Sequence, residues 1–269
     1  MTNKSKRFWR NILDMSRRWF GFLLFPPRCP VCDIILEPEQ IEKGIHSSCE
    51  RKLFPIYGAV CMHCGRPFRK NLRKNPYKSN EYLDDSIQEY CQECLKRGYV
   101  HPGTIIKSGK ALYMYRGKIK QTMYRLKYSN KREYAVFFAK QAVQMYPWFF
   151  DVDAIIPVPM YRKKEKLRGY NQAEVLAKAL AAITNVPVDN KVVCRIRNTQ
   201  PQKELNDIQR KNNLKNAFQK GKSIVKYKKV LIVDDIYTTG ATVETVAEEL
   251  KCIGIRQVYV LCICIGGEL

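Results

Sequence analysis

The sequence predicts an α/β protein with a parallel sheet, preceded by a small cysteine-rich module. From Ile105 onward, short apolar runs alternate with helical patterns, which is typical of βαβ units whose sheet is covered on both faces. Seven of the eleven cysteines lie between Cys29 and Cys94, mostly as C-x-x-C pairs. The 269 residues, 45% of them hydrophobic, are enough for one large domain or a domain with such a module.

The chain is strongly basic, with 48 Lys and Arg against 25 Asp and Glu. Residues 191–229 hold twelve basic and two acidic residues, a local net charge of +10. Such a surface suits polyanions, namely nucleic acid, phosphorylated small molecules or anionic lipid. The alternative is a solvated basic face without a partner. No cleavable signal is evident, and no apolar run reaches the roughly 18–20 residues that span a bilayer, so we expect a cytoplasmic protein.

Residues 1–27 predict a basic amphipathic helix that Pro26 and Pro27 end. Its apolar positions fall on one face and basic residues crowd the rest. The apolar positions are Phe8, Ile12, Met15, Trp19 and Leu23. Contact of residues 4–25 with the inner face of the membrane is one interpretation. Packing on the cysteine module or on a partner protein is the other.

Residues 28–100 predict a double zinc-ribbon module. Four two-ligand pairs occur along it: Cys29 and Cys32, His46 and Cys49, Cys61 and Cys64, Cys91 and Cys94. Each pair places two ligands on one side of a tetrahedral metal, and imidazole can replace thiolate at zinc. Sequential pairing gives a site of three cysteines and one histidine followed by a site of four cysteines, but crossed pairing also fits. Both zincs are expected to be structural, and His63 is expected to face solvent.

Residues 105–269 predict the main domain. A strand in 104–115 is followed by helices in 116–129 and 132–146, a short buried strand in 153–159 and a helix in 171–183. Further strands are predicted in 192–196, 228–233 and 256–265. We expect these strands to form the parallel sheet, with helices on both faces.

The stretch "KKVLIVDDIYTTGATVETVAEEL" places two adjacent carboxylates where a strand gives way to a helix. It resembles the signature of type I phosphoribosyltransferases, which bind 5-phosphoribosyl-1-pyrophosphate. Carboxylates at a strand end accept hydrogen bonds from ribose hydroxyls, and a helix N-terminus binds phosphate. The resemblance assigns the ribose to Asp234 and Asp235 and the 5′-phosphate to Thr238, Thr239, Gly240, Ala241 and Thr242. Tyr237 departs from the aliphatic residue usual in metabolic members.

The zinc pairs and the motifs "FPPRCPVC", "CGRPF", "YRGKIKQTMYRLKYS", "RGYNQ", "RNTQPQKELNDIQRKNN" and "DDIYTTGAT" together are similar to the ComF family of competence proteins. The resemblance covers nearly the whole chain from Leu24. His46 and the insert 69–86 depart from the commonest pattern. The resemblance implies a pyrophosphate loop with Arg168, Asn171 and Gln172, with Lys127 as a second basic candidate. It also implies a flap containing Thr199, Gln202 and Arg210.

The family resemblance implies a role in natural competence, in which the protein assists uptake of single-stranded DNA beside a helicase-like ATPase. Two alternatives stay open. One is an active phosphoribosyltransferase that uses Mg²⁺ and an unknown acceptor, and the other is a sensor of the nucleotide precursor. Catalytic residues are not assigned by the sequence.

Overall fold

The computed structural model describes residues 26–68, 89–198, 217–223 and 226–266. The predicted N-terminal helix and the flap residues Thr199, Gln202 and Arg210 lie outside this range. The chain divides into two compact units, Met1–Lys52 and Leu53–Leu269. In the described part of the chain, no helix is both long enough and apolar enough to cross a bilayer.

The first unit contains little regular structure among its described residues. It has two short helices, α2 (Pro38–Ile41) and α3 (Ser47–Glu50), and an isolated bridge between Arg28 and Ile35. Among residues 26–52, few apolar side chains are buried besides the cysteines; Val31, Leu36 and Ile45 are among them. A core this small in these residues favours a further source of stability there, such as a metal.

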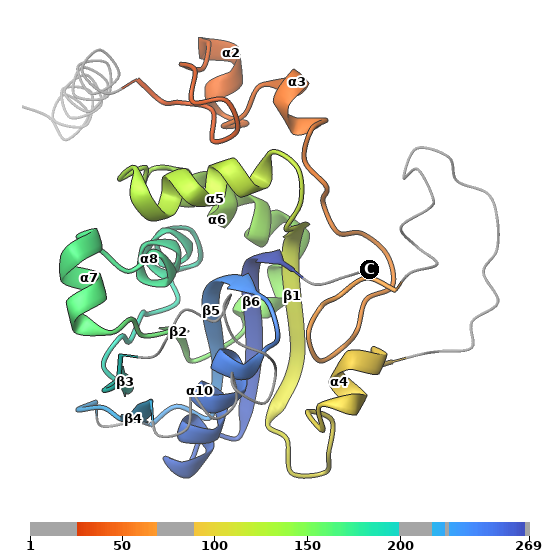
Figure 1. Cartoon of the computed structure of the whole chain (residues 1–269), viewed down its shortest axis with the longest axis vertical. Helices are drawn as coiled ribbons and strands as arrows, with labels where there is room; N and C mark the ends of the chain where they lie inside the picture. Colours follow the sequence, from red (N-terminus) through yellow and green to blue (C-terminus); the bar gives the residue numbers. More distant parts are fainter. Residues whose placement is uncertain (1–25, 69–88, 199–216, 224–225, 267–269) are drawn as a thin grey trace, which may run out of the picture. The chain divides into compact units, whose positions relative to one another are not determined.

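The second unit contains a four-stranded parallel sheet in the order β1-β6-β5-β2, visible at the centre of Figure 1. The strands are β1 (Ile106–Met114), β2 (Ala154–Pro157), β5 (Lys229–Tyr237) and β6 (Gln257–Ile265). Strands β5 and β6 are buried over most of their length, as expected for strands covered on both faces. The predicted parallel sheet is confirmed.

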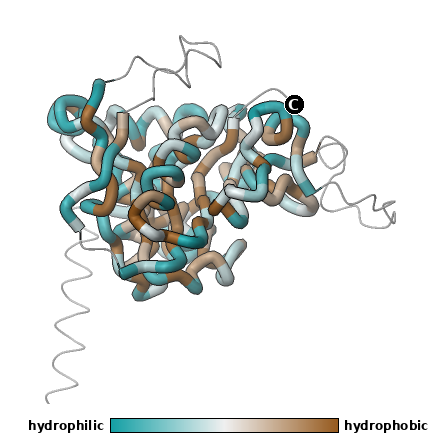
Figure 2. The backbone as a smooth tube through the Cα atoms, turned by 90° about the horizontal axis from the view of Figure 1, so that it is seen from below, coloured by the Kyte–Doolittle hydropathy of each residue, from teal (hydrophilic) through white to brown (hydrophobic). Residues whose placement is uncertain are grey.

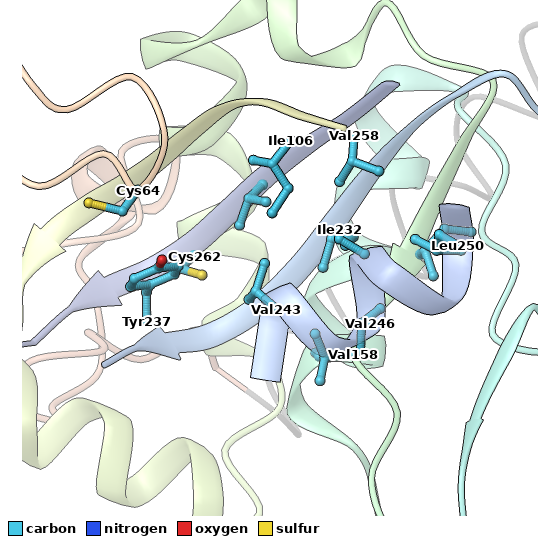
Figure 3. Packing of buried hydrophobic residues seen from close by; sticks show 14 of the residues in the cluster. Cys64, Ile106, Val158, Ile232, Tyr237, Val243, Val246, Leu250, Val258 and Cys262 are labelled. Atoms are coloured by element: carbon cyan, nitrogen blue, oxygen red, sulfur yellow. The ribbon is translucent and has the colours of Figure 1, made fainter. Parts of the chain in front are cut away.

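Helices cover both faces of this sheet. On one side α6 (Tyr134–Met145) packs on α8 (Gln172–Thr184), and α8 packs on β2 and β5. On the other side lies α10 (Ala241–Cys252), and Figure 3 shows its Val243, Val246 and Leu250 beside Ile232 and Val258 of the sheet. Hydrophobic backbone segments gather in the interior and hydrophilic ones toward the outside (Figure 2).

Two further helices lie near the carboxyl ends of the strands. Helix α5 (Ile119–Tyr128) follows β1, and α7 (Arg162–Arg168) lies between β2 and α8, as Figure 1 shows. Helix α5 buries Ile119, Met123 and Leu126 at helical spacing, which fixes its apolar face toward the fold. The 3-10 helix η2 (Pro147–Phe150) completes the connection from α6 to β2.

The strand predicted in 192–196 does not join the main sheet. It forms β3 (Val193–Arg195), which pairs antiparallel with β4 (Phe218–Lys220) in a separate two-stranded sheet. A three-residue strand with two partly exposed positions lacks the continuous apolar run that a central parallel strand needs. The prediction of this strand was right and its place in the sheet was wrong.

The two compact units meet between Lys52 and Leu53, within the range 28–100 that the sequence assigns to the zinc module. Chain residues after Lys52 bond directly to β1: Ile56 N–H donates to Leu112 O at 2.9 Å, and Gly109 N–H donates to Met62 O at 2.7 Å. We call the part of the chain that holds Cys61, Cys64, Cys91 and Cys94 the second ribbon. This ribbon, which includes α4 (Gln92–Lys96), therefore belongs to the same unit as the sheet.

Candidate functional site

The two adjacent carboxylates lie on β5, at the carboxyl end of the parallel sheet. Asp234 is in register with Cys262 of β6, and the pairing continues to Tyr237 opposite Ile265. The strand is thus longer than expected, since it runs past the acids and not only up to them. Ligands in open α/β sheets bind at the carboxyl ends of strands, and both acids are there.

The surroundings of the two acids differ. Lys127 of α5 places its Nζ 2.8 Å from Asp235 Oδ2. Asp234 instead accepts a hydrogen bond from the Asp235 backbone N–H at 2.8 Å. Burial, and then the neighbouring charge of Asp235, raise the pKa of Asp234 to about 7. Burial alone would lower the pKa of Lys127, but the Asp235 carboxylate outweighs it and the net shift is upward.

The turn after β5 forms the N-terminal end of α10. Thr238 is exposed, Thr239 is buried and Thr242 is half-buried in the first helical turn. Gly240 has φ +83°, a left-handed conformation that L side chains rarely adopt, and a Cβ there would collide with the Tyr237 ring. The first backbone N–H groups of a helix have no partner within it, so the turn presents donors and a positive dipole end to an anion.

The predicted pyrophosphate-loop residues divide into two kinds. Asn171 caps α8: its amide donates to Val158 O at 2.9 Å and its Oδ1 accepts from Ala173 N–H at 3.1 Å. Gln172 is buried, its Oε1 accepts from Arg168 Nη1 at 2.6 Å, and its Nε2 has no protein partner. Asn171 thus holds the local backbone, while Arg168 and Gln172 offer polar groups at the start of α8. Lys127 lies with the acid pair.

The first metal cluster brings together Cys29, Cys32, His46 and Cys49, whose ligand atoms all lie within 4.8 Å of one another. His46 Nδ1 is 3.3 Å from Cys32 Sγ. The other ring nitrogen, Nε2, lies 3.3 Å from Ile35 O, the second contact that a metal-ligating histidine ordinarily makes. This donor set fits zinc, and its residues follow the sequential pairing.

The second metal cluster contains Cys61, Cys64, Cys91 and Cys94, all of them buried. The Sγ atoms of Cys61 and Cys94 are 3.9 Å apart, and those of Cys64 and Cys91 are 3.7 Å apart. Four thiolates around one zinc with Zn–S distances near 2.3 Å are separated by about 3.8 Å. The cluster therefore fits a closed tetrahedral zinc site without an open position for substrate.

The prediction that His63 faces solvent is wrong. The residue is buried, with only 2% of its surface exposed. Its Nε2 lies 2.5 Å from Glu244 Oε1, in the first turn of α10, and its ring stacks on Tyr99 at 5.7 Å between centroids. Arg66 reaches the same region, where its Nη2 donates to Thr238 O at 3.3 Å and to Gly266 O at 3.1 Å. The second ribbon thus supports the turn that follows the acids.

These supporting contacts were missed because they join residues about 170 to 200 positions apart. Tyr237, which the sequence marks only as a departure from the usual aliphatic residue, belongs to the same group of contacts. It is buried against Gly240, with Tyr99 beside it, and Figure 3 shows it near Cys64 and Cys262. Its aromatic side chain was a sequence signal that a large group packs beneath the turn.

Two family models match separate parts of the chain. Residues 22–95 match the double zinc ribbon domain family, and residues 169–268 match the phosphoribosyl transferase domain family. A solved purine phosphoribosyltransferase from Pyrococcus horikoshii aligns with 49% of this chain and 71% of its own at 20% identity, with a TM-score of only 0.29.

Three curated relatives cover most of the chain. Competence protein F of Haemophilus influenzae is 29% identical over 81% of this chain and 89% of its own. The DNA utilization protein YhgH of Salmonella typhimurium is 28% identical over 82% and 96%. Competence protein ComFC of Bacillus subtilis is 25% identical over 79% of each chain.

Proposed function

We propose that this chain, a homologue of competence protein F and ComFC with a double zinc ribbon and a phosphoribosyltransferase domain, assists the handling of incoming single-stranded DNA. In this proposal the site at the end of β5 takes 5-phosphoribosyl-1-pyrophosphate or a related ribose phosphate. The observation that best supports this ligand is the position of the acid pair. The two acids lie beside the N-terminus of α10, and Lys127 contacts Asp235.

The ligand's groups match the site in charge and position. The ribose hydroxyls would donate to the carboxylates of Asp234 and Asp235, replacing part of the contact that Lys127 makes. The 5′-phosphate would accept from backbone N–H groups of the turn Thr238–Thr242, where the helix dipole favours negative charge. The pyrophosphate would lie toward Arg168 and the unsatisfied Nε2 of Gln172, because an unpaired buried donor favours an acceptor.

Mg²⁺ fits this site only as a companion of the ligand. Among the described residues, groups of three or more potential metal ligands occur at the two cysteine clusters alone. Mg²⁺ prefers oxygen ligands and keeps several waters, so it is ordinarily held by one or two carboxylates together with substrate phosphates. When bound it would neutralise pyrophosphate charge, while the side chains of this chain orient the ribose.

The competence role is testable by complementation of a Haemophilus influenzae strain that lacks its own competence protein F. We expect the wild-type chain to restore transformation and the Asp235→Asn variant to lower its frequency at least about tenfold, because a charge-assisted hydrogen bond contributes about 1.5–3 kcal/mol. Asp151→Asn is the matched control, since Asp151 is an exposed acid paired with Lys229 away from the site. Equal abundance of the variants is checked by immunoblot.

Two results would count against the proposal. Failure of an abundant wild-type chain to restore any transformation would contradict the competence role. Full transformation by Asp235→Asn would contradict the requirement for the ribose site and leave DNA handling to other surfaces.

A further inference from the structure

Two tyrosines on α5 expose most of their rings to solvent. Tyr124 is 62% exposed and Tyr128 is 63% exposed, although the opposite face of the helix is fully buried. They are four residues apart and therefore lie on one face, with ring centroids 5.0 Å apart and an angle of 47° between the planes. Burial in the hydrophobic core therefore does not account for these two aromatic side chains.

Cations surround this pair. The Arg168 guanidinium lies over the Tyr128 ring, 4.9 Å from its centroid, and Lys120 extends over the Tyr115 ring at the other end of α5, 5.8 Å from its centroid. Residues 116–132 include seven Lys and Arg and no Asp or Glu, and α7 adds five basic residues against one acid. The aromatic faces are thus set in a positively charged region.

The same surface continues to the ribose site. Lys127 precedes Tyr128 in α5 and contacts Asp235, while Arg168 joins Tyr128 to Gln172 at the start of α8. A polymer lying along the exposed face of α5 would therefore pass next to the candidate ligand site. Figure 1 shows α5 close to α7 and α8.

We propose that Tyr124 and Tyr128, with Arg168 behind Tyr128, form a stacking surface for consecutive bases of single-stranded DNA. The proposal deepens the proposed function and rests on it. Aromatic side chains stack any base because every base has a π-face, and the surrounding cations hold the phosphates. Duplex DNA is a poor occupant, because its bases are already stacked and paired and offer no free face.

The test measures binding of a fluorescently labelled oligothymidylate of about 15 nucleotides to the full-length, zinc-loaded protein by fluorescence anisotropy. The double variant Tyr124→Leu, Tyr128→Leu keeps an apolar pair at i and i+4 of the helix but removes stacking. We expect its affinity to fall by at least about tenfold, since each stacked base is worth roughly a five- to hundredfold change. The double Phe variant keeps the rings and is expected to bind within about twofold of wild type.

Two controls separate stacking from charge. Trp148→Leu removes another exposed aromatic, 61% exposed on η2, and is expected to leave binding unchanged. An abasic oligomer of the same length keeps the phosphates, and we expect wild type to bind it as weakly as the Leu variant binds oligothymidylate. Photo-crosslinking of wild type with 5-iododeoxyuridine is expected to mark Tyr124 or Tyr128, and it needs no variant to fold.

Each result decides between stacking at this surface and the alternatives. If wild type binds oligothymidylate but the Leu variant or the abasic oligomer binds equally well, the stacking surface is wrong while DNA handling stands. Crosslinks confined to other segments would have the same meaning. If the wild-type chain binds no single-stranded DNA, the surface is overturned together with direct DNA contact, and the complementation experiment still decides the competence role.

Discussion

Asp234 and Asp235 are chemically identical but have different surroundings. Asp235 lies 2.8 Å from the ammonium of Lys127, whereas burial next to a like charge raises the pKa of Asp234 to about 7. In the proposed site, a partly protonated Asp234 would donate as well as accept near neutral pH, which suits ribose hydroxyls that do both.

The raised pKa predicts a pH dependence of stability. The folded protein binds the Asp234 proton more tightly than the unfolded chain, whose pKa is near 3.8. This group therefore makes the free energy of unfolding fall as pH rises from about 4 to about 7, with a slope of at most about 1.4 kcal/mol per pH unit. Above the folded pKa its contribution is constant. Asp234→Asn should remove this slope and be stabilising at about pH 8 relative to wild type.

Urea unfolding of both proteins between about pH 5.5 and 8 measures this difference. Taking the difference cancels the contribution of the zinc sites, which both proteins share. Asp151→Asn serves as the control because Asp151 is 89% exposed. Parallel stability curves for wild type and Asp234→Asn would contradict the assigned environment.

The second ribbon and the turn after β5 act as one structural element. His63 contacts Glu244 in the first turn of α10, Arg66 donates to the carbonyl of Thr238, and Tyr237 fills the space under Gly240. Because these contacts fix the backbone of the turn, we expect the ribbon to act on the proposed ligand site by positioning the groups that would bind phosphate.

This predicts that Arg66→Met weakens phosphate binding without loss of zinc. Removing two hydrogen bonds to backbone carbonyls frees the turn, and we expect the affinity for 5-phosphoribosyl-1-pyrophosphate to fall roughly five- to tenfold, at about 1 kcal/mol for a hydrogen bond. Lys96→Met is the matched control, because Lys96 is an exposed basic residue in the last turn of α4 of the same ribbon. Calorimetry gives the affinity and atomic absorption the zinc content. Unchanged affinity with full zinc would refute the positioning role.

Local sequence patterns were sufficient to predict most elements but not their long-range contacts. The apolar runs of β5 and β6 and the helical spacing in α5, α6, α8 and α10 identify those elements, because burial period and element type are local properties. The partner of β3, the end of β5 and the burial of His63 depend on residues far away in the chain. For the candidate site, the acids and the turn were predicted, whereas the Lys127–Asp235 pair and the capping role of Asn171 required the fold.

The two cysteine clusters belong to different compact units. Cys29, Cys32, His46 and Cys49 lie in the first unit, while Cys61, Cys64, Cys91 and Cys94 lie in the unit that contains the sheet. Cys61, Cys64, Cys91 and Cys94 also form part of the same buried cluster as residues of β1, β5 and α10. The spacing of the cysteines predicts a single module for both clusters, because spacing does not reveal that, among the described residues, only the second part of the module forms backbone hydrogen bonds with β1.

The loss of either zinc should therefore destabilise a different part of the protein. Structural zinc contributes apparent binding energies of about 10–16 kcal/mol to small modules, so a lost ligand destabilises whatever packs on that site. We expect Cys64→Ser to raise amide hydrogen exchange in β1 and in the first turn of α10. Cys32→Ser should raise exchange only within residues 26–52. Hydrogen exchange with mass spectrometry on both variants checks this, and equal protection of β1 in the two would contradict it.

The most direct measurement is a calorimetric titration of 5-phosphoribosyl-1-pyrophosphate with Mg²⁺ into the folded, zinc-loaded protein and into Asp235→Asn. We predict saturable binding by wild type and an affinity at least about tenfold lower for the variant, since Asp235 loses a charge-assisted contact with the ribose. Asp151→Asn should bind like wild type. Absence of binding by wild type, or equal binding by Asp235→Asn, would contradict a ribose phosphate site at the end of β5.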